Sequence, residues 1–164
     1  MAAPCFIAWA GDTSASTGPP AGITVTAQKT VLQLKASSTQ GLRIIEWGYA
    51  VSAPPSAPIQ WELVDTAAVA ATVTTIGSGI RAYNNASQTA SNAVIGTAAS
   101  GFNASAEGSI TASRLLAYQY DTALWFKQQF PLGREPDILP NDILRIRCTP
   151  QASTVVQVFL VWEE

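Results

Sequence analysis

The chain has 164 residues, a formal net charge of −2 and only 12% charged residues, whereas about a quarter is usual for globular proteins. Its nine Lys and Arg residues are scattered and do not form the basic stripe of a nucleic-acid-binding protein. No apolar run reaches the roughly eighteen residues that a transmembrane helix needs. We therefore expect neither nucleic acid nor a membrane as a partner.

Ala, Ser, Thr, Asn and Gln take the place of charged residues over much of the chain. Such a neutral surface suits a subunit that buries its outside against neighbours; a small-residue surface without a partner is the alternative. The segment 1–16 lacks the positive start and long apolar run of an export signal, so we expect synthesis in the cytoplasm. The length suits a single domain, 1–164.

Short runs of alternating or β-branched residues, separated by turn residues, recur along the chain and indicate an all-β protein. We predict an antiparallel β-sandwich, jelly-roll-like, with about nine to eleven short strands. The alanine-rich segment 67–71 could begin a short helix. The predicted strands cover residues 5–10, 23–26, 29–36, 42–51, 59–65, 72–76, 105–111, 114–120, 124–130, 143–148 and 154–162.

The stretch 42–65 is the centre of this prediction, because two long strands flank the proline-rich connector 52–58. In the second strand, Ile59, Trp61 and Leu63 share one face. The strand 143–148 also alternates. Its expected inward set is Leu144, Ile146 and Cys148, and its expected outward set is Ile143, Arg145 and Arg147.

Two further segments stand out by composition. Residues 154–162 are apolar on both faces, which is typical of a central strand. Residues 77–113 are rich in Ala, Ser, Asn and Gly and carry only two charges. Charge-poor loops of this length are uncommon in compact domains unless they have a function. We predict an ordered excursion, or arm, that lies over the sandwich or on a neighbouring subunit, anchored by Tyr83 and Phe102.

Residue types that carry chemistry are sparse. The chain has no histidine, which removes His-based nucleophilic dyads and most zinc sites. Glu46 and Glu62 could face each other as a glycosidase pair, although solvent-facing charges on a sheet are the simpler interpretation. Asp137 and Asp142 could bind calcium, with a turn or capping role as the alternative. We expect no enzyme activity, no cofactor and no metal.

For the cysteines and most of the aromatic residues, a structural role in the core is the simplest interpretation. Cys5 and Cys148 lie among apolar neighbours and are expected to be reduced core residues, with a disulfide as the alternative. Most of the five tryptophans are expected in the core. Trp125, Tyr118 and Tyr120 are the best candidates for an exposed sugar-stacking platform.

The chain contains the segments LRIIEWGYAVSAPPSAPIQWELVDT, GFNASAEGSITASR, and a tail from FPLGREPDILPNDILRIR to VVQVFLVWEE. In this pattern, which covers most of 42–164, the chain resembles a group of small virion-associated proteins of tailed bacteriophages. The resemblance implies a head decoration (cement) protein or a related structural subunit. It also implies a β-rich unit that binds capsomer surfaces in many copies, often as a trimer, and it carries over no catalytic residues.

We therefore expect a non-enzymatic virion structural protein on the capsid surface, made in the cytoplasm of the host bacterium. The expected partners are the major capsid protein and further copies of the chain, with a trimer favoured. Segments 11–22 and 77–113 are the hypothesised contact regions. Two alternatives are a tail or fibre-tip module that recognises a host surface glycan, and a glycan hydrolase. The candidate interface residues are Arg81, Tyr83, Phe102, Asn103, Tyr118 and Tyr120.

Overall fold

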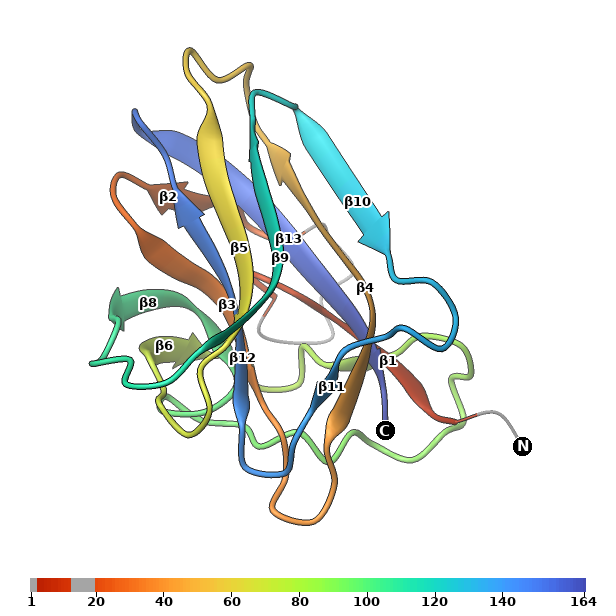
Figure 1. Ribbon diagram of the computed structural model, residues 1–164. Helices are drawn as coiled ribbons and strands as arrows, with labels where there is room; N and C mark the ends of the chain where they lie inside the picture. The colour runs from red at the N-terminus through yellow and green to blue at the C-terminus, as the bar shows by residue number, and fades with distance from the viewer. Residues whose placement is uncertain (1–2, 13–19) are drawn as a thin grey trace.

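The computed structural model describes residues 3–12 and 20–164, and these form two antiparallel sheets packed face to face (Figure 1). The strands of the first sheet are β1 (Cys5–Trp9), β2 (Ile23–Val25), β4 (Leu42–Val51), β7 (Arg81–Ala82), β10 (Trp125–Gln129), β11 (Asp137–Ile138) and β13 (Thr154–Glu163). This seven-stranded sheet has the order β10-β4-β13-β1-β7, with β11 beside β4 and β2 beside β13. The all-β antiparallel sandwich predicted from the alternation is confirmed.

The second sheet has six strands in the order β6-β8-β3-β12-β5-β9. Its strands are β3 (Lys29–Lys35), β5 (Ile59–Asp65), β6 (Thr72–Thr75), β8 (Gly101–Ala106), β9 (Arg114–Asp121) and β12 (Ile143–Thr149). No helix occurs in the described parts of the chain, so none there could span a membrane. The predicted short helix at 67–71 is wrong: Ala67 has a φ of 49°, and its backbone N–H is held by the Asp65 carboxylate in a turn.

The two arms of the stretch 42–65 belong to different sheets. β4 lies in the seven-stranded sheet and β5 in the six-stranded one, so the proline-rich connector carries the chain across the sandwich. The arms face each other through the core, where the rings of Tyr49 and Trp61 stack with centroids 4.0 Å apart. Trp47, Trp61 and Trp162 are fully buried there. Truncating a core side chain of this size to Ala costs about 3–5 kcal/mol, so this aromatic cluster holds the two sheets together.

Both ends of the chain lie in the seven-stranded sheet. β13 sits between β4 and β1, as its apolar residues on both faces predicted. Cys5 pairs with Glu163, and the backbone N–H of Glu164 donates to the carbonyl of Pro4. The described N-terminal residues and the C-terminus therefore lie side by side at one end of the sandwich (Figure 1).

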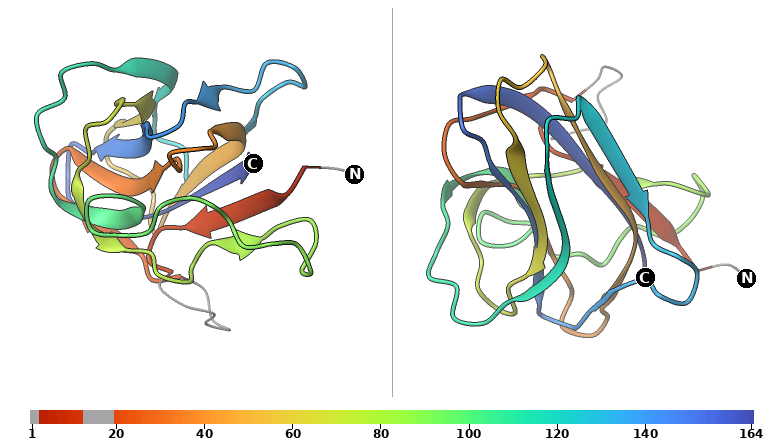
Figure 2. Two further views of the ribbon diagram at one scale, coloured as in Figure 1. Left: turned by 90° about the horizontal axis from the view of Figure 1, so that it is seen from below. Right: turned by 45° about the horizontal axis from the view of Figure 1, so that its top comes forward.

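The segment 77–113 wraps around the sandwich instead of forming a separate arm. β7 pairs with β1 at the edge of the seven-stranded sheet, and β8 pairs with β3 in the other sheet (Figure 2). Thirteen strands are named within the described ranges, more than the nine to eleven expected. The difference includes the two-residue strands β7 and β11, which are too short to show a period-2 pattern. The strand expected at 105–111 is displaced to 101–106.

Candidate functional site

The outer face of the seven-stranded sheet, formed by side chains that point away from the core, carries a strip of apolar side chains on β1 and β13. The strand register places Trp9 opposite Phe159 and Ile7 opposite Val161. The rings of Trp9 and Phe159 pack with centroids 4.8 Å apart. The inner face of the same strands forms the core, so β1 and β13 carry apolar side chains on both sides. The outer side of β4 and β10 is mixed, because Arg43, Glu46, Lys127 and Gln129 point outward there. An apolar strip such as that on β1 and β13 is unusual on a sheet face that meets only water.

A glycine lets the aromatic surface lie close to the strands. Gly48 on β4 pairs with Phe159, and a Cβ at this position would stand 2.5 Å from the Phe159 ring. Lys127 lies on the other side of Gly48, and its ammonium is 3.0 Å from the Glu46 carboxylate. This pair neutralises the two charges. The outer face therefore presents aromatic and aliphatic groups beside a balanced ion pair.

Two hollows open on the outer face. One, of about 310 Å³, is lined by Gly22, Ala50, Val51, Ser52, Val155 and Gln157. The other, of about 520 Å³, is lined by Arg43, Ile45, Gln129, Phe130, Leu132, Gly133, Glu135, Asp137 and Glu163. Leu132 stands beside the second hollow with 98% of its surface exposed, and Trp125 on the edge strand β10 is 71% exposed.

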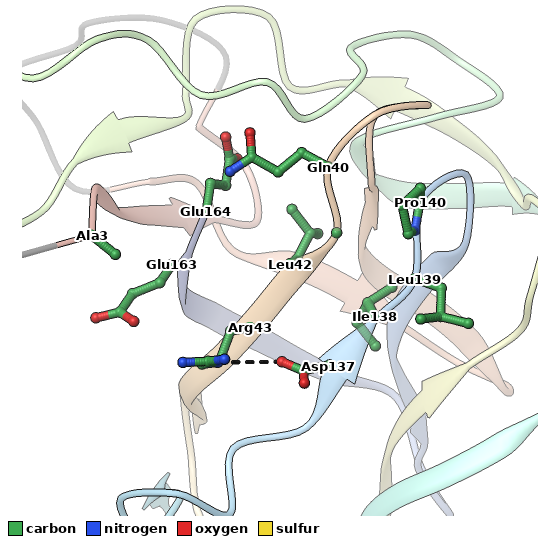
Figure 3. A pocket seen from close by; sticks show the side chains of 11 residues that line it. Ala3, Gln40, Leu42, Arg43, Asp137, Ile138, Leu139, Pro140, Glu163 and Glu164 are labelled. Carbon is green, nitrogen blue, oxygen red and sulfur yellow. Dashed lines mark hydrogen bonds and ion pairs between the residues drawn. The ribbon is translucent and has the colours of Figure 1, made fainter.

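A third pocket, of about 450 Å³, lies near the chain ends, where the buried side chains of Leu42 and Ile138 line it (Figure 3). The Arg43 guanidinium is 3.3 Å from the Asp137 carboxylate in the same pocket. The Glu164 carboxylate accepts hydrogen bonds from several groups, including the backbone of Asn92 at 2.7 Å. Both carboxylates thus have structural partners, and the pocket offers apolar contact without a free acid–base pair.

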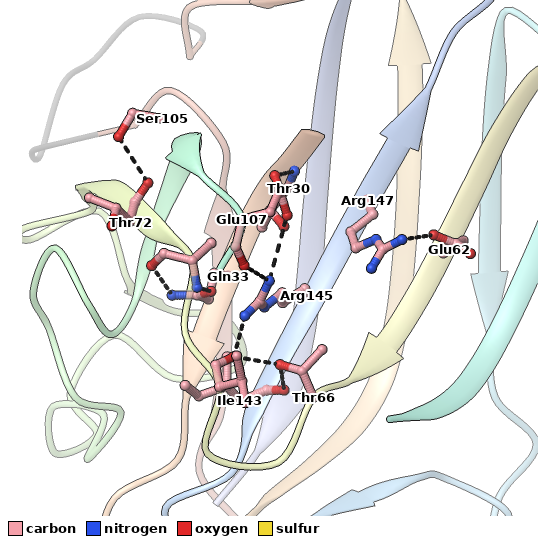
Figure 4. Close-up of polar contacts among 12 residues, drawn as sticks. Thr30, Gln33, Glu62, Thr66, Thr72, Ser105, Glu107, Ile143, Arg145 and Arg147 are labelled. Carbon is pink, nitrogen blue, oxygen red and sulfur yellow. Dashed lines mark hydrogen bonds and ion pairs between the residues drawn. The ribbon is translucent and has the colours of Figure 1, made fainter. Parts of the chain in front are cut away.

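The outer face of the six-stranded sheet is partly covered by the chain itself. Gln33 is fully buried, and its side chain both donates to and accepts from backbone groups at Ala71 (Figure 4). Arg145, expected to face outward into solvent, has no exposed surface. It donates to the carbonyls of Val69 and Glu107, and burial lowers its pKa. The outward direction was correct, but the segments around 66–72 and 101–107 exclude water from this part of the face.

The six predicted interface residues fall into three groups. Phe102 is 7% exposed and belongs to the core, so its assignment as an interface residue is corrected. Arg81 forms an ion pair with Asp12 at 2.6 Å, and its strand neighbour Ile7 lies on the outer face of the seven-stranded sheet. The remaining four are Tyr83 beside Arg81, Asn103 with a φ of 53°, and the exposed pair Tyr118 and Tyr120 on β9.

Segment 77–113 packs largely on its own sandwich, because β7 pairs with β1 and β8 pairs with β3. The other hypothesised contact region, 11–22, lies mostly outside the described residues, because these omit 13–19. In the described part, the backbone carbonyl of Pro20 accepts a hydrogen bond from Gln157 at 2.6 Å. This bond ties the end of the loop to the outer face of the seven-stranded sheet.

The carboxylates do not assemble into a catalytic or metal-binding group. Glu46 and Glu62 do not face each other, because they point outward from different sheets, and each pairs with a cation at 3.0 Å, Lys127 and Arg147 respectively. Burial, followed by the charge of Asp65, raises the pKa of Asp142. Among residues 3–12 and 20–164, no three His, Cys, Asp or Glu side chains lie close enough to hold a metal ion.

Cys5 and Cys148 are both free and buried, one in each sheet. Burial raises the pKa of the Cys148 thiol to about 12, and burial with the nearby Glu163 charge raises that of Cys5. Since the thiolate is the reactive form, we expect neither thiol of the native protein to react with Ellman's reagent at mildly alkaline pH. Two thiols per chain should react in denaturant. A single reactive cysteine in the native state, or none in denaturant, would contradict this arrangement.

Sequence reasoning missed most of the outer face. Trp9 was assigned to the core, and Val155 and Leu132 were not singled out. The pattern of β13, in which both alternating sets are apolar, was the signal that could have located it. No family model matches the chain, and no curated protein or solved structure was found to be similar to it.

Proposed function

We propose that this chain is a non-enzymatic structural protein of a tailed-phage virion, most specifically a head decoration (cement) subunit. The observation that carries the proposal is the strip of apolar side chains on the outer side of β1 and β13, where the opposite side of the same strands already forms the core. An apolar strip with open hollows beside it and polar groups around it is suited to docking on another protein surface.

The partner in this proposal is the major capsid protein, with further copies of the chain around it. A standard protein–protein interface buries about 1,600 Å² in total. The outer face and its rim can supply part of this buried area. Many copies on one particle give a high combined occupancy even where each contact is weak, particularly if the chain forms a trimer. Lys127 already pairs with Glu46 at 3.0 Å, so covering this part of the face would not leave a buried charge without its partner.

Quantitative peptide mass spectrometry on gradient-purified particles tests the proposal by the number of copies of this chain relative to the major capsid protein. A stoichiometry comparable to that of the capsid protein is expected for a decoration subunit. A handful of copies would place the protein in the tail or a fibre, the alternative location. Absence from the particle would reject a virion role altogether.

A further inference from the structure

We propose that the open half of the outer face of the six-stranded sheet, built around Tyr118 and Tyr120, binds a neutral oligosaccharide. This site is separate from the docking face described above, and the inference goes beyond the structural role. The two tyrosines lie on the edge strand β9 and are 46% and 53% exposed. Residues two apart on a strand point to the same side, with Cα atoms about 6.6 Å apart.

Polar side chains continue the platform across the neighbouring strands. The register places Glu62 opposite Tyr118 and Gln60 opposite Tyr120 on β5. One strand further, on β12, Arg147 lies opposite Glu62 and Thr149 opposite Gln60. Two aromatic rings are therefore followed by a carboxylate, an amide, a guanidinium and a hydroxyl within three adjacent strands. Rings with an apolar body pack against the C–H face of a sugar, while the polar groups suit its hydroxyls.

The hydrogen-bonding capacity of this platform is largely unused. Within residues 3–12 and 20–164, the phenol groups of Tyr118 and Tyr120 and the amide of Gln60 have no hydrogen-bond partner. Arg147 Nε and Thr149 Oγ1 are shielded from solvent and also lack one. A buried polar atom left without a partner costs about 1–3 kcal/mol. Arg147 and Thr149 lie on β12 opposite Glu62 and Gln60, so a hydroxyl-bearing ligand on this face can satisfy these atoms once neighbouring side chains adjust their rotamers.

The charges select the class of ligand. A terminal nitrogen of Arg147 is 3.0 Å from Glu62 Oε2, and both side chains are mostly buried. The Arg147–Glu62 pair has no net charge, so it attracts neither a phosphate nor a cation strongly. It offers hydrogen-bond donors and acceptors side by side. Glu107, whose carboxylate bonds Thr30, marks where the covered half of the face begins. An uncharged chain of sugars lying across β9, β5 and β12 fits these groups better than an anionic or peptidic ligand.

The test is an NMR titration of the ¹⁵N-labelled protein with three neutral tetrasaccharides: maltotetraose, cellotetraose and tetraacetylchitotetraose. At least one is expected to shift the amide signals of β9, β5 and β12. Tyr118→Ala with Tyr120→Ala should weaken that binding at least tenfold. Tyr118→Phe with Tyr120→Phe, which keeps the rings, should retain most of it. Tyr83→Ala is the matched control, since it removes an equally exposed tyrosine from the other sheet.

Three results would overturn the proposal: no binding of any of the three sugars at millimolar concentration, shifts that map elsewhere, or unchanged affinity in the double Ala variant. Self-association that depends on Tyr118 and Tyr120, without an effect of sugar, would instead identify this face as a contact between copies. If the double Ala variant unfolds, Gln60→Ala supplies the same comparison. None of these results changes the copy number on particles, so the two proposals fail independently.

Discussion

Placing carboxylates at Trp125 and Val155 together is expected to reduce the copies bound per particle at least 100-fold. Both side chains lie at the outer face of the seven-stranded sheet, and they are 71% and 38% exposed in the free chain. A charge buried in an apolar interface without a partner costs several kcal/mol, and about 2.8 kcal/mol corresponds to a factor of 100 in affinity. The double variant Trp125→Glu, Val155→Glu should fold normally, since exposed positions contribute little to stability.

The matched control for this experiment is Leu115→Glu. Leu115 is 55% exposed but belongs to β9 in the other sheet, so it should leave particle binding unchanged. Binding is measured by adding each purified variant to particles stripped of the protein and separating bound from free protein on a gradient. Normal occupancy by the double variant, or equal losses in both variants, would remove the outer face of the seven-stranded sheet from the docking proposal.

Alternation predicted the strands because burial on one face leaves a period-2 signal in the sequence. The strands 42–51 and 59–65 were predicted with their observed bounds, and Ile59, Trp61 and Leu63 are buried together as expected. The same signal does not state which strands pair. The two arms look like partners because they are adjacent in the chain, yet each finds its neighbours among strands whose paired residues lie 49 or more positions further on.

Arg145 shows a second limit of local patterns. Its position in the alternation was assigned correctly, but a charged side chain on an outward face was taken as solvent-exposed. The cover comes from segments 38 and 76 residues away in the chain, through hydrogen bonds to the carbonyls of Glu107 and Val69. Those segments carry small residues without a hydrophobic period. Their local sequence therefore does not predict that they pack on a sheet.

The candidate surfaces were predicted only in part, because local sequence patterns do not show which side chains lie together on a face. Composition favoured an assembly, but it describes the whole surface and does not locate a face. Tyr118 and Tyr120 were named as candidates for exposed aromatic residues, and they are 46% and 53% exposed. Trp9 and Phe159 were missed because an apolar residue in an apolar strand is assigned to the core by default. Only the observed register shows that they lie together on the outside.

Arg145→Met is expected to lower the free energy of unfolding by about 2–4 kcal/mol, because it removes the donor to the Glu107 carbonyl and separates the Glu107 carboxylate from its buried cation. The Val69 carbonyl loses one of its two donors and keeps the Thr66 hydroxyl at 2.8 Å. The guanidinium lies 3.5 Å from that carboxylate and hydrogen-bonds the backbone of both covering segments. Met keeps most of the side-chain volume, so the loss reports on polar contacts and not on a cavity. Urea unfolding followed by tryptophan fluorescence measures it.

Arg147→Met is the control on the same strand and the same face, where the covering segments end. Its side chain is 16% exposed and bonds neither covering segment, so its removal should cost less than the removal of the fully buried Arg145, although Glu62 loses its ion-pair partner. Hydrogen exchange should separate the two variants further: Arg145→Met frees the amides around 66–72, and Arg147→Met leaves them protected. Equal losses of stability, or protected amides in both, would mean that the cover is held by apolar packing of residues such as Val73 and Ala104 and not by the buried arginine.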